Sequence, residues 1–213
     1  LPQQTLTEAL ADLDTAIATG VTHLSCYHLT LEPNTPFAAQ PPDLPDDDVS
    51  ADMQEAIEAQ LADAGFMHYE TSAFARPGQQ CLHNLNYWQF GDYLGIGAGA
   101  HGKLSFHDRV RRDMRHKHPN AYLDAAARGE FVQESREVGT SELPFEFMMN
   151  AARLNDGFAL DLFERHTALP LDVLMPRLLA AREDGLLELA AGRVTPTLRG
   201  RRFLNELLQR FLD

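Results

Sequence analysis

The first third of the chain alternates between two apolar patterns. In residues 5–19 and 46–64, apolar side chains recur every three or four positions, which predicts two amphipathic helices. Residues 22–30 and 66–73 are instead rich in strand formers and are bounded by Gly or turn residues. The predicted order is therefore helix, strand, helix, strand, for which right-handed crossovers between parallel strands are the default. This order is typical of an α/β barrel or an open α/β sheet.

Near Val138 the composition of the chain changes. Residues 1–139 hold 20 acidic and 9 basic residues, whereas residues 140–213 hold 11 acidic and 9 basic residues. A strongly acidic region is thus followed by one that is close to neutral. We therefore predict two domains, residues 1–137 and residues 138–213.

The second of these domains is predicted to be mainly helical. Helical spacing of apolar residues covers four segments, residues 141–154, 160–166, 171–184 and 198–212. Residues 185–189 and 193–195 flank a short turn at residues 190–192, which indicates a small β-hairpin. Helices combined with such a hairpin are typical of a winged-helix domain.

Composition limits the classes of function. The net charge of −13 argues against general nucleic-acid binding, which depends on neutralisation of phosphates by Lys and Arg. No apolar run approaches the roughly 20 residues that a bilayer-spanning helix needs. The two cysteines, Cys26 and Cys81, lie far apart, so we expect no disulfide framework and a reducing, cytoplasmic location. Two thiolates are also too few for an iron–sulfur cluster, which usually takes three or four.

The segment from Cys81 to Trp88 concentrates ring systems and polar tips. It holds the only Trp of the chain together with His83, Asn84 and Tyr87. One interpretation is a surface loop held by a half-buried Trp. The other is a ligand platform, in which the aromatic rings offer flat faces and His83 offers an imidazole nitrogen for a haem iron, with Cys81 as an alternative soft ligand.

A glycine-rich segment follows closely. Gly95, Gly97 and Gly99 alternate with small or apolar residues and lead to His101. The spacing is not that of a dinucleotide-binding loop, which needs G-x-G-x-x-G before a helix. The segment is either a strand with close backbone contacts or a floor against which a flat cofactor lies, with His101 at its edge.

Polar residues also follow the predicted strands. Thr30, Glu32 and Glu70 lie near strand ends, which in α/β barrels face the active site, although structural carboxylates fit equally well. A basic run forms another candidate constellation: Arg109, Arg111, Arg112 and Arg115. Such a run is usually a solvated or acid-paired face, and the alternative is a receiver for propionates, phosphates or an acidic partner.

Several blocks together resemble one known family. In the first part of the chain these blocks are residues 23–37, 68–78, 83–88 and 93–101. In the second part they are residues 146–149, 153–154, 184–187 and 195–200. Over nearly its whole length the chain resembles the haem chaperone HemW family, whose members are often described as oxygen-independent coproporphyrinogen III oxidase-like.

The resemblance implies a radical SAM protein of the α/β class. Its fold would be the C-terminal part of a partial (β/α) barrel, followed by a small helical, winged-helix-like domain. The family carries a C-x-x-x-C-x-x-C motif in the N-terminal half of the barrel, and this chain lacks that motif. We therefore expect the chain to be the C-terminal part of a longer protein. The ligands of a [4Fe-4S] cluster and most contacts to S-adenosyl-L-methionine (SAM) would lie upstream.

The resemblance also implies cofactor-binding residues. The candidates are His83, Asn84, Tyr87, Trp88, Thr30, His101, Gly97 and Gly99. The His-Asn-x-x-Tyr-Trp motif is linked to haem in this family, and His83 is the candidate ligand of the haem iron. Thr30 and His101 match positions that line SAM in the related porphyrinogen oxidases.

The expected function is that of a radical SAM haem chaperone that binds haem and passes it to acceptor proteins, some of them membrane-associated. The first alternative is a coproporphyrinogen III oxidase, which carries out an oxidative decarboxylation. The second is a winged-helix module that binds nucleic acid through four arginines, Arg193, Arg199, Arg201 and Arg202. The near-neutral second domain argues against this last alternative, so no nucleic acid is expected among the partners. The chain alone is expected to have no catalysis of its own, because the cluster ligands are not within it.

Overall fold

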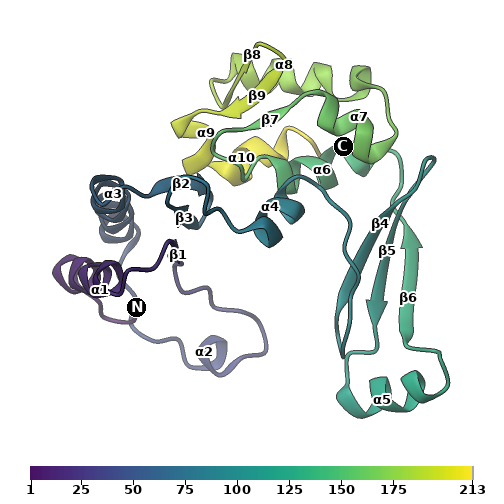
Figure 1. Ribbon diagram of the computed structural model, residues 1–213, viewed down its shortest axis with the longest axis horizontal. Helices are drawn as coiled ribbons and strands as arrows, with labels where there is room; N and C mark the ends of the chain where they lie inside the picture. The colour runs from purple at the N-terminus through teal and green to yellow at the C-terminus, as the bar shows by residue number, and fades with distance from the viewer. Residues whose placement is uncertain (213) are drawn as a thin grey trace. The chain divides into compact units, whose positions relative to one another are not determined.

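The computed structural model describes residues 1–212 and separates into two units. The first unit is Leu1–Cys81 and the second begins at Leu82 (Figure 1). The predicted domain boundary at Val138 falls inside the second unit and remains a prediction.

The first unit contains three helices and three short strands. They are α1 (Leu6–Ala18), β1 (His23–Ser25), α2 (Pro36–Ala39), α3 (Asp47–Asp63), β2 (Met67–Glu70) and β3 (Ala73–Ala75). Helix α1 begins at a capping box: the Thr5 hydroxyl accepts from the Glu8 N–H, and the Glu8 carboxylate accepts from the Thr5 N–H. In α3 the Asp46 carboxylate caps the first turn, and Asp47 and Asp48 lie at the positive end of the helix dipole.

Neighbouring strands in the sheet of this unit are antiparallel, although β1 and β2, which the crossover connects, run parallel as predicted. The strand order is β1-β3-β2, and β3 runs antiparallel to both of its neighbours. A tight turn at Thr71 and Ser72 reverses the chain after β2 and inserts β3 between the two strands that the crossover connects. Strands β1 and β2 therefore run parallel to each other without pairing.

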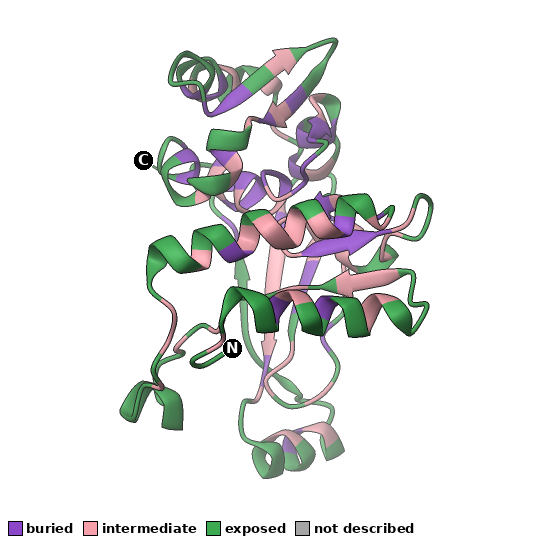
Figure 2. Cartoon of the chain, turned by 90° about the vertical axis from the view of Figure 1, so that its left-hand side faces the viewer, coloured by how far each residue is buried: buried purple, intermediate pink, exposed green. Residues whose placement is uncertain are grey.

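A small hydrophobic cluster joins the two long helices to this sheet. It consists of Leu13 from α1, Leu61 from α3, Phe66 and Phe74. Most of the outer surface of both helices is exposed (Figure 2). The predicted strand over residues 22–30 is shorter than expected, because β3 is only three residues long and offers β1 no partner beyond Ser25.

The second unit begins with a helix and a meander of three strands. The elements are α4 (Leu82–Trp88), β4 (His101–Ser105), β5 (Val110–Arg115), α5 (Pro119–Ala127) and β6 (Val132–Glu137). The order β4-β5-β6 is antiparallel throughout, and α5 lies in the connection between β5 and β6 (Figure 1). Strand β6 is exposed along its whole length, since it is an edge strand with polar and charged residues.

The remainder of this unit is helical with a small sheet. Its elements are α6 (Leu143–Ala151), β7 (Phe158–Ala159), α7 (Asp161–Thr167), the 3₁₀ turn η1 (Leu171–Val173), α8 (Met175–Glu183), β8 (Leu187–Ala190), β9 (Arg193–Pro196), α9 (Leu198–Arg202) and α10 (Leu204–Gln209). The predicted hairpin is confirmed. Strands β8 and β9 pair in register around Ala191 and Gly192, which both have positive φ, as a two-residue hairpin turn requires.

The last helix differs from the prediction. The apolar spacing over residues 198–212 predicts one helix, but the structure has α9 and α10, separated at Phe203 with φ −111° and ψ 48°. Gly200 packs its backbone against Leu186, where a side-chain carbon would collide with the Leu186 carbonyl oxygen. This close contact fixes α9 against the hairpin, and the chain then changes direction so that Leu207 and Phe211 reach the core.

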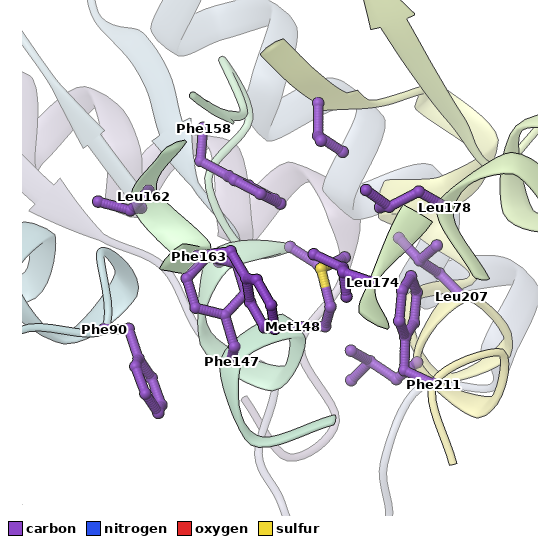
Figure 3. Packing of buried hydrophobic residues seen from close by; sticks show 14 of the residues in the cluster. Phe90, Phe147, Met148, Phe158, Leu162, Phe163, Leu174, Leu178, Leu207 and Phe211 are labelled. Atoms are coloured by element: carbon purple, nitrogen blue, oxygen red, sulfur yellow. The ribbon is translucent and has the colours of Figure 1, made fainter. Parts of the chain in front are cut away.

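The helices of this unit surround one large hydrophobic core. Phe147 lies near its centre and makes edge-to-face contacts with Phe90, Phe158 and Phe163, with ring centroids 5.6, 5.1 and 5.2 Å apart (Figure 3). Met148 and Leu174 extend the core toward α8 and α10. The predicted mixed α/β class is confirmed, with three small sheets and helices packed on them.

Candidate functional site

The segment expected to form a loop is helix α4, so that expectation is corrected. His83, Asn84, Tyr87 and Trp88 all lie on this one helix. Leu85 and Trp88, three residues apart, pack against the core of the second unit and set the helical phase. The sequence contains this signal, but a seven-residue segment with two core-facing apolar positions is too short to separate a helix from a loop.

The outer face of α4 presents a row of aromatic rings. His83 is exposed, and its ring meets that of Tyr87 edge-on, with centroids 4.8 Å apart. Tyr87 in turn contacts the ring of Tyr93, with centroids 4.4 Å apart. The Tyr93 hydroxyl accepts a 3.0 Å hydrogen bond from Arg112, which fixes the far end of the row. An exposed imidazole at one end of a fixed aromatic row is an arrangement that suits a flat ligand with a metal centre.

Trp88 forms the inner edge of the same helix. Its ring packs on the core, and the guanidinium of Arg153 lies over it at 4.9 Å from the ring centroid. The indole N–H is buried and has no acceptor within residues 1–212. The predicted half-buried Trp is therefore present, and it is stacked against a cation.

The C-terminal end of α4 is anchored by a buried lysine. Lys103 of β4 is 1% exposed, and its ammonium donates to the Phe90 carbonyl at 2.8 Å, the Ser105 hydroxyl at 2.8 Å and the Asp92 carboxylate at 3.1 Å. All three donors of the ammonium are thereby used. The Lys103 nitrogen also lies 3.9 Å from the ring centroid of Phe90. This anchor holds the chain immediately after α4, where Phe90 takes a positive φ of 58°.

The charges of this anchor are shifted by their surroundings. Burial lowers the pKa of Lys103, and the bond to Asp92 only partly offsets that effect. Burial also raises the pKa of Asp92, but hydrogen bonds from Ser105 and the neighbouring Lys103 ammonium outweigh it, so the net pKa is lowered. Sequence reasoning missed Lys103, because a single lysine in a polar strand looks like a surface residue.

The glycine-rich segment is a close-packed connection into β4. A side-chain carbon on Gly95 would lie 2.5 Å from the His101 carbonyl oxygen, so this position needs glycine. Gly97 and Gly99 have φ values of 104° and 72°, which side chains rarely adopt. Tyr93 forms the one β-bridge between this segment and β4, with Lys103. His101 is the first residue of β4 and is exposed. The role of this segment as a floor for a flat cofactor stays a prediction.

The strand-end candidates belong to the first unit. Thr30 and Glu32 are exposed in the segment after β1. Glu70 is 3% exposed, and its carboxylate accepts from the Ser72 N–H at 3.3 Å. The roles proposed for these residues stay predictions.

The basic run is paired with acidic residues. Arg112 and Arg136 both bind the buried Glu146, Arg109 contacts Asp108, and Arg111 contacts Asp113. Arg115 instead donates to the Gly95 carbonyl at 2.9 Å and stacks over Phe131. The run therefore holds β5 against β6 and α6, which matches the acid-paired interpretation.

The described residues do not supply the ligands of a metal cluster. Within residues 1–212, no group of three or more His, Cys, Asp or Glu side chains is placed to hold a metal ion. Cys26 and Cys81 are both free thiols, and burial raises the pKa of the Cys26 thiol. A haem differs from a cluster in that one imidazole can serve as its protein ligand, and the exposed His83 fits that need. No helix in the described part of the chain has the length and apolar character to cross a membrane.

The chain resembles a solved structure in its fold and several curated proteins in its sequence. The chain superposes with a TM-score of 0.73 on a structure reported as "Coproporphyrinogen III oxidase (HemN) from Escherichia coli is a Radical SAM enzyme". That match has 19% sequence identity and covers 99% of this chain and 52% of the other. Residues 141–203 match the HemN C-terminal domain family. The fold is therefore that of the C-terminal part of a HemN-type radical SAM structure, as predicted.

Several curated proteins have a higher sequence identity to this chain than this solved structure has. The chain is 46% identical over 213 residues to "Heme chaperone HemW" of Escherichia coli K12 and 46% identical to the protein of that name from Haemophilus influenzae. It is 32% identical to the protein of that name from Bacillus subtilis. These matches cover 100% of this chain and 55 to 56% of the relatives. The chain is thus similar over its whole length to proteins named heme chaperone HemW, and it spans about half the length of the curated relatives that it matches.

Proposed function

We propose that this chain carries the haem-binding helix of a HemW-type haem chaperone. The observation that supports this most directly is the outer face of α4, where an exposed imidazole and two phenol rings form one row. The region over which the chain is 46% identical to proteins named heme chaperone HemW covers all 213 residues and so includes α4. Such a protein would bind haem and transfer it to acceptor proteins.

His83 is the residue that we assign to the haem iron. Its ring is exposed on α4, and among residues 1–212 its imidazole nitrogens have no hydrogen-bond partner. Neutral imidazole is the usual protein ligand of haem iron. Asn84, Tyr87 and Trp88 would shape the face beside it, and Cys81, one residue before α4, is the alternative ligand together with His101.

The experiment is a haem titration of the full-length protein that carries this chain, followed by its Soret absorbance. His83→Ala should shift the Soret maximum and weaken haem binding on the order of tenfold or more, because it removes an axial ligand. His107→Ala is the matched control, since His107 is 91% exposed in the β4–β5 turn and contacts only Asp108. An unchanged spectrum and affinity in His83→Ala would remove His83 from this role and direct the search to His101 and Cys81.

A cluster and SAM would belong to the complete protein. Radical SAM chemistry requires a reduced [4Fe-4S] cluster, which the two cysteines of this chain do not provide. Thr30 and His101 each match a position that lines SAM in the related porphyrinogen oxidases, and we propose that role for each of them in the complete protein. Gly97 and Gly99 are proposed only as part of a floor for a flat cofactor. An assay of the complete protein for coproporphyrinogen III conversion distinguishes a chaperone from an oxidase, and turnover of that substrate would favour the oxidase.

A further inference from the structure

Haem is a dianion at its edge, so a haem site needs a cation as well as an iron ligand. Free haem carries two propionate carboxylates, and partly buried carboxylates are most strongly bound by arginine in a two-pronged arrangement. A propionate bound beside α4 would therefore need a cation whose N–H donors are not already used within the protein.

Most cations near α4 are already occupied. The Lys103 ammonium has three acceptors within the protein. Arg112 is bound to Glu146 and to the Tyr93 hydroxyl. Arg115 is 8% exposed and bound to the Gly95 carbonyl. The Lys103 ammonium has no donor left, Arg112 is already neutralised by Glu146, and Arg115 is too deeply buried to meet a ligand at the surface.

Arg153, by contrast, is only half-buried and keeps unbonded donors. It follows α6, which contacts α4 (Figure 1). Its guanidinium lies over the Trp88 ring, 4.9 Å from the ring centroid. One donor, Nε, is used by the Met149 carbonyl at 3.2 Å. Among residues 1–212 the two terminal nitrogens have no acceptor, and no carboxylate pairs with this side chain. The four N–H groups of those nitrogens are thus available.

The stacking on Trp88 prepares Arg153 for a carboxylate. The guanidinium carbon lies 4.9 Å from the Trp88 ring centroid, and a guanidinium on an aromatic face can still donate from its edge to a carboxylate. The bond from Nε to Met149 fixes the rotation of the side chain. An arginine held in this way loses little conformational freedom on binding, which favours tight recognition.

We propose that Arg153 binds a propionate carboxylate of the tetrapyrrole that lies on the α4 face. This inference rests on the proposed function, and it names the group that the site recognises besides the iron. It also gives a role to the cation that lies over the Trp88 ring. The recognised chemistry is a tetrapyrrole with free carboxylates, so a tetrapyrrole with esterified carboxylates should bind less well.

The test compares haem with haem dimethyl ester, whose propionates carry no charge. The full-length protein should prefer haem by roughly tenfold or more, as expected for a charge-assisted hydrogen bond. Arg153→Gln should lose this preference by weakening the binding of haem while leaving that of the ester nearly unchanged. Arg153→Lys keeps the charge without the fork and should recover part of the preference. Arg128→Gln is the control, because Arg128 pairs with Glu130 on the surface beside α5.

The outcomes separate this inference from the proposed function. If Arg153→Gln weakens haem and the ester equally, Arg153 only supports Trp88 and the inference is wrong, while haem binding stands. A preference for haem that survives in Arg153→Gln also overturns it. If the unaltered protein binds neither ligand, the proposed function fails and this inference with it.

Discussion

The two units of the chain have hydrophobic cores of very different size. In the first unit, four buried residues form the cluster between α1, α3 and the sheet. In the second unit, 21 buried residues form one continuous core around Phe147. Local stability follows the amount of apolar surface that is buried, so the second unit should resist opening more strongly. The candidate haem helix, α4, packs on this larger core.

Each unit also contains a cation that lies over an aromatic ring. Arg76 lies over Phe66, 4.7 Å from its ring centroid, and donates to the Ala64 carbonyl at 3.2 Å. Lys103 lies over Phe90, is almost completely buried and has three acceptors. The first arrangement closes the turn between α3 and β2. The second fixes the end of α4 with a buried charge, which is costly unless its donors are satisfied, as those of Lys103 are.

The largest effect should come from the centre of the larger core. Phe147→Ala removes a ring that contacts three other phenylalanines, and we expect the second unit to lose about 3–5 kcal/mol of stability. Denaturant unfolding followed by near-ultraviolet circular dichroism measures this loss. A loss well under about 1 kcal/mol would show that the aromatic cluster is not the centre of the core.

A smaller effect is expected in the first unit. Leu61 is fully buried between α1 and the sheet, and Leu61→Ala should cost about 2–3 kcal/mol, at the lower end for leucine, because a small cluster relaxes easily. Hydrogen exchange should show faster opening of the β3 amides with little change in α6. If α6 amides accelerate as much as those of β3, the two units unfold together and the contrast between their cores does not control opening.

The sequence predicts those parts of the fold that depend on local patterns. The capping box at Thr5 and the hairpin around Gly192 form as expected, since each depends on residues a few positions apart. The antiparallel insertion of β3 and the break at Phe203 depend on contacts between distant segments. Nothing in the local pattern of residues 66–73 indicates that the chain reverses at Ser72.

The same distinction between local sequence patterns and contacts of distant segments applies to the candidate site. The clustering of His83 and Tyr87 follows from their spacing in the sequence, although the loop expected there is a helix. Lys103 and Arg153 could not be predicted. Their roles depend on burial by strands and helices that are distant in sequence, and single cations are usually exposed.

The smallest effect tests the anchor at the end of α4 through its pH dependence. The pKa of Asp92 is lowered in the folded state, because the hydrogen bonds from Ser105 and the ammonium of Lys103 outweigh the effect of burial. Because folding lowers this pKa, the ionised carboxylate stabilises the fold at pH values above its ordinary pKa. The contribution is lost as the pH falls through the lowered pKa of the folded state. Asp92→Asn should therefore cost about 0.2–1 kcal/mol near neutral pH, since the carboxylate is partly exposed. The variant should also make the acidic limb of the stability profile shallower.

Thermal unfolding between neutral and acidic pH measures both effects, with Asp172→Asn as the control because Asp172 is exposed in η1. Parallel profiles for the unaltered protein and Asp92→Asn would contradict a stabilising role for the charge of Asp92, and the anchor would then depend on the bond from Lys103 to the Phe90 carbonyl.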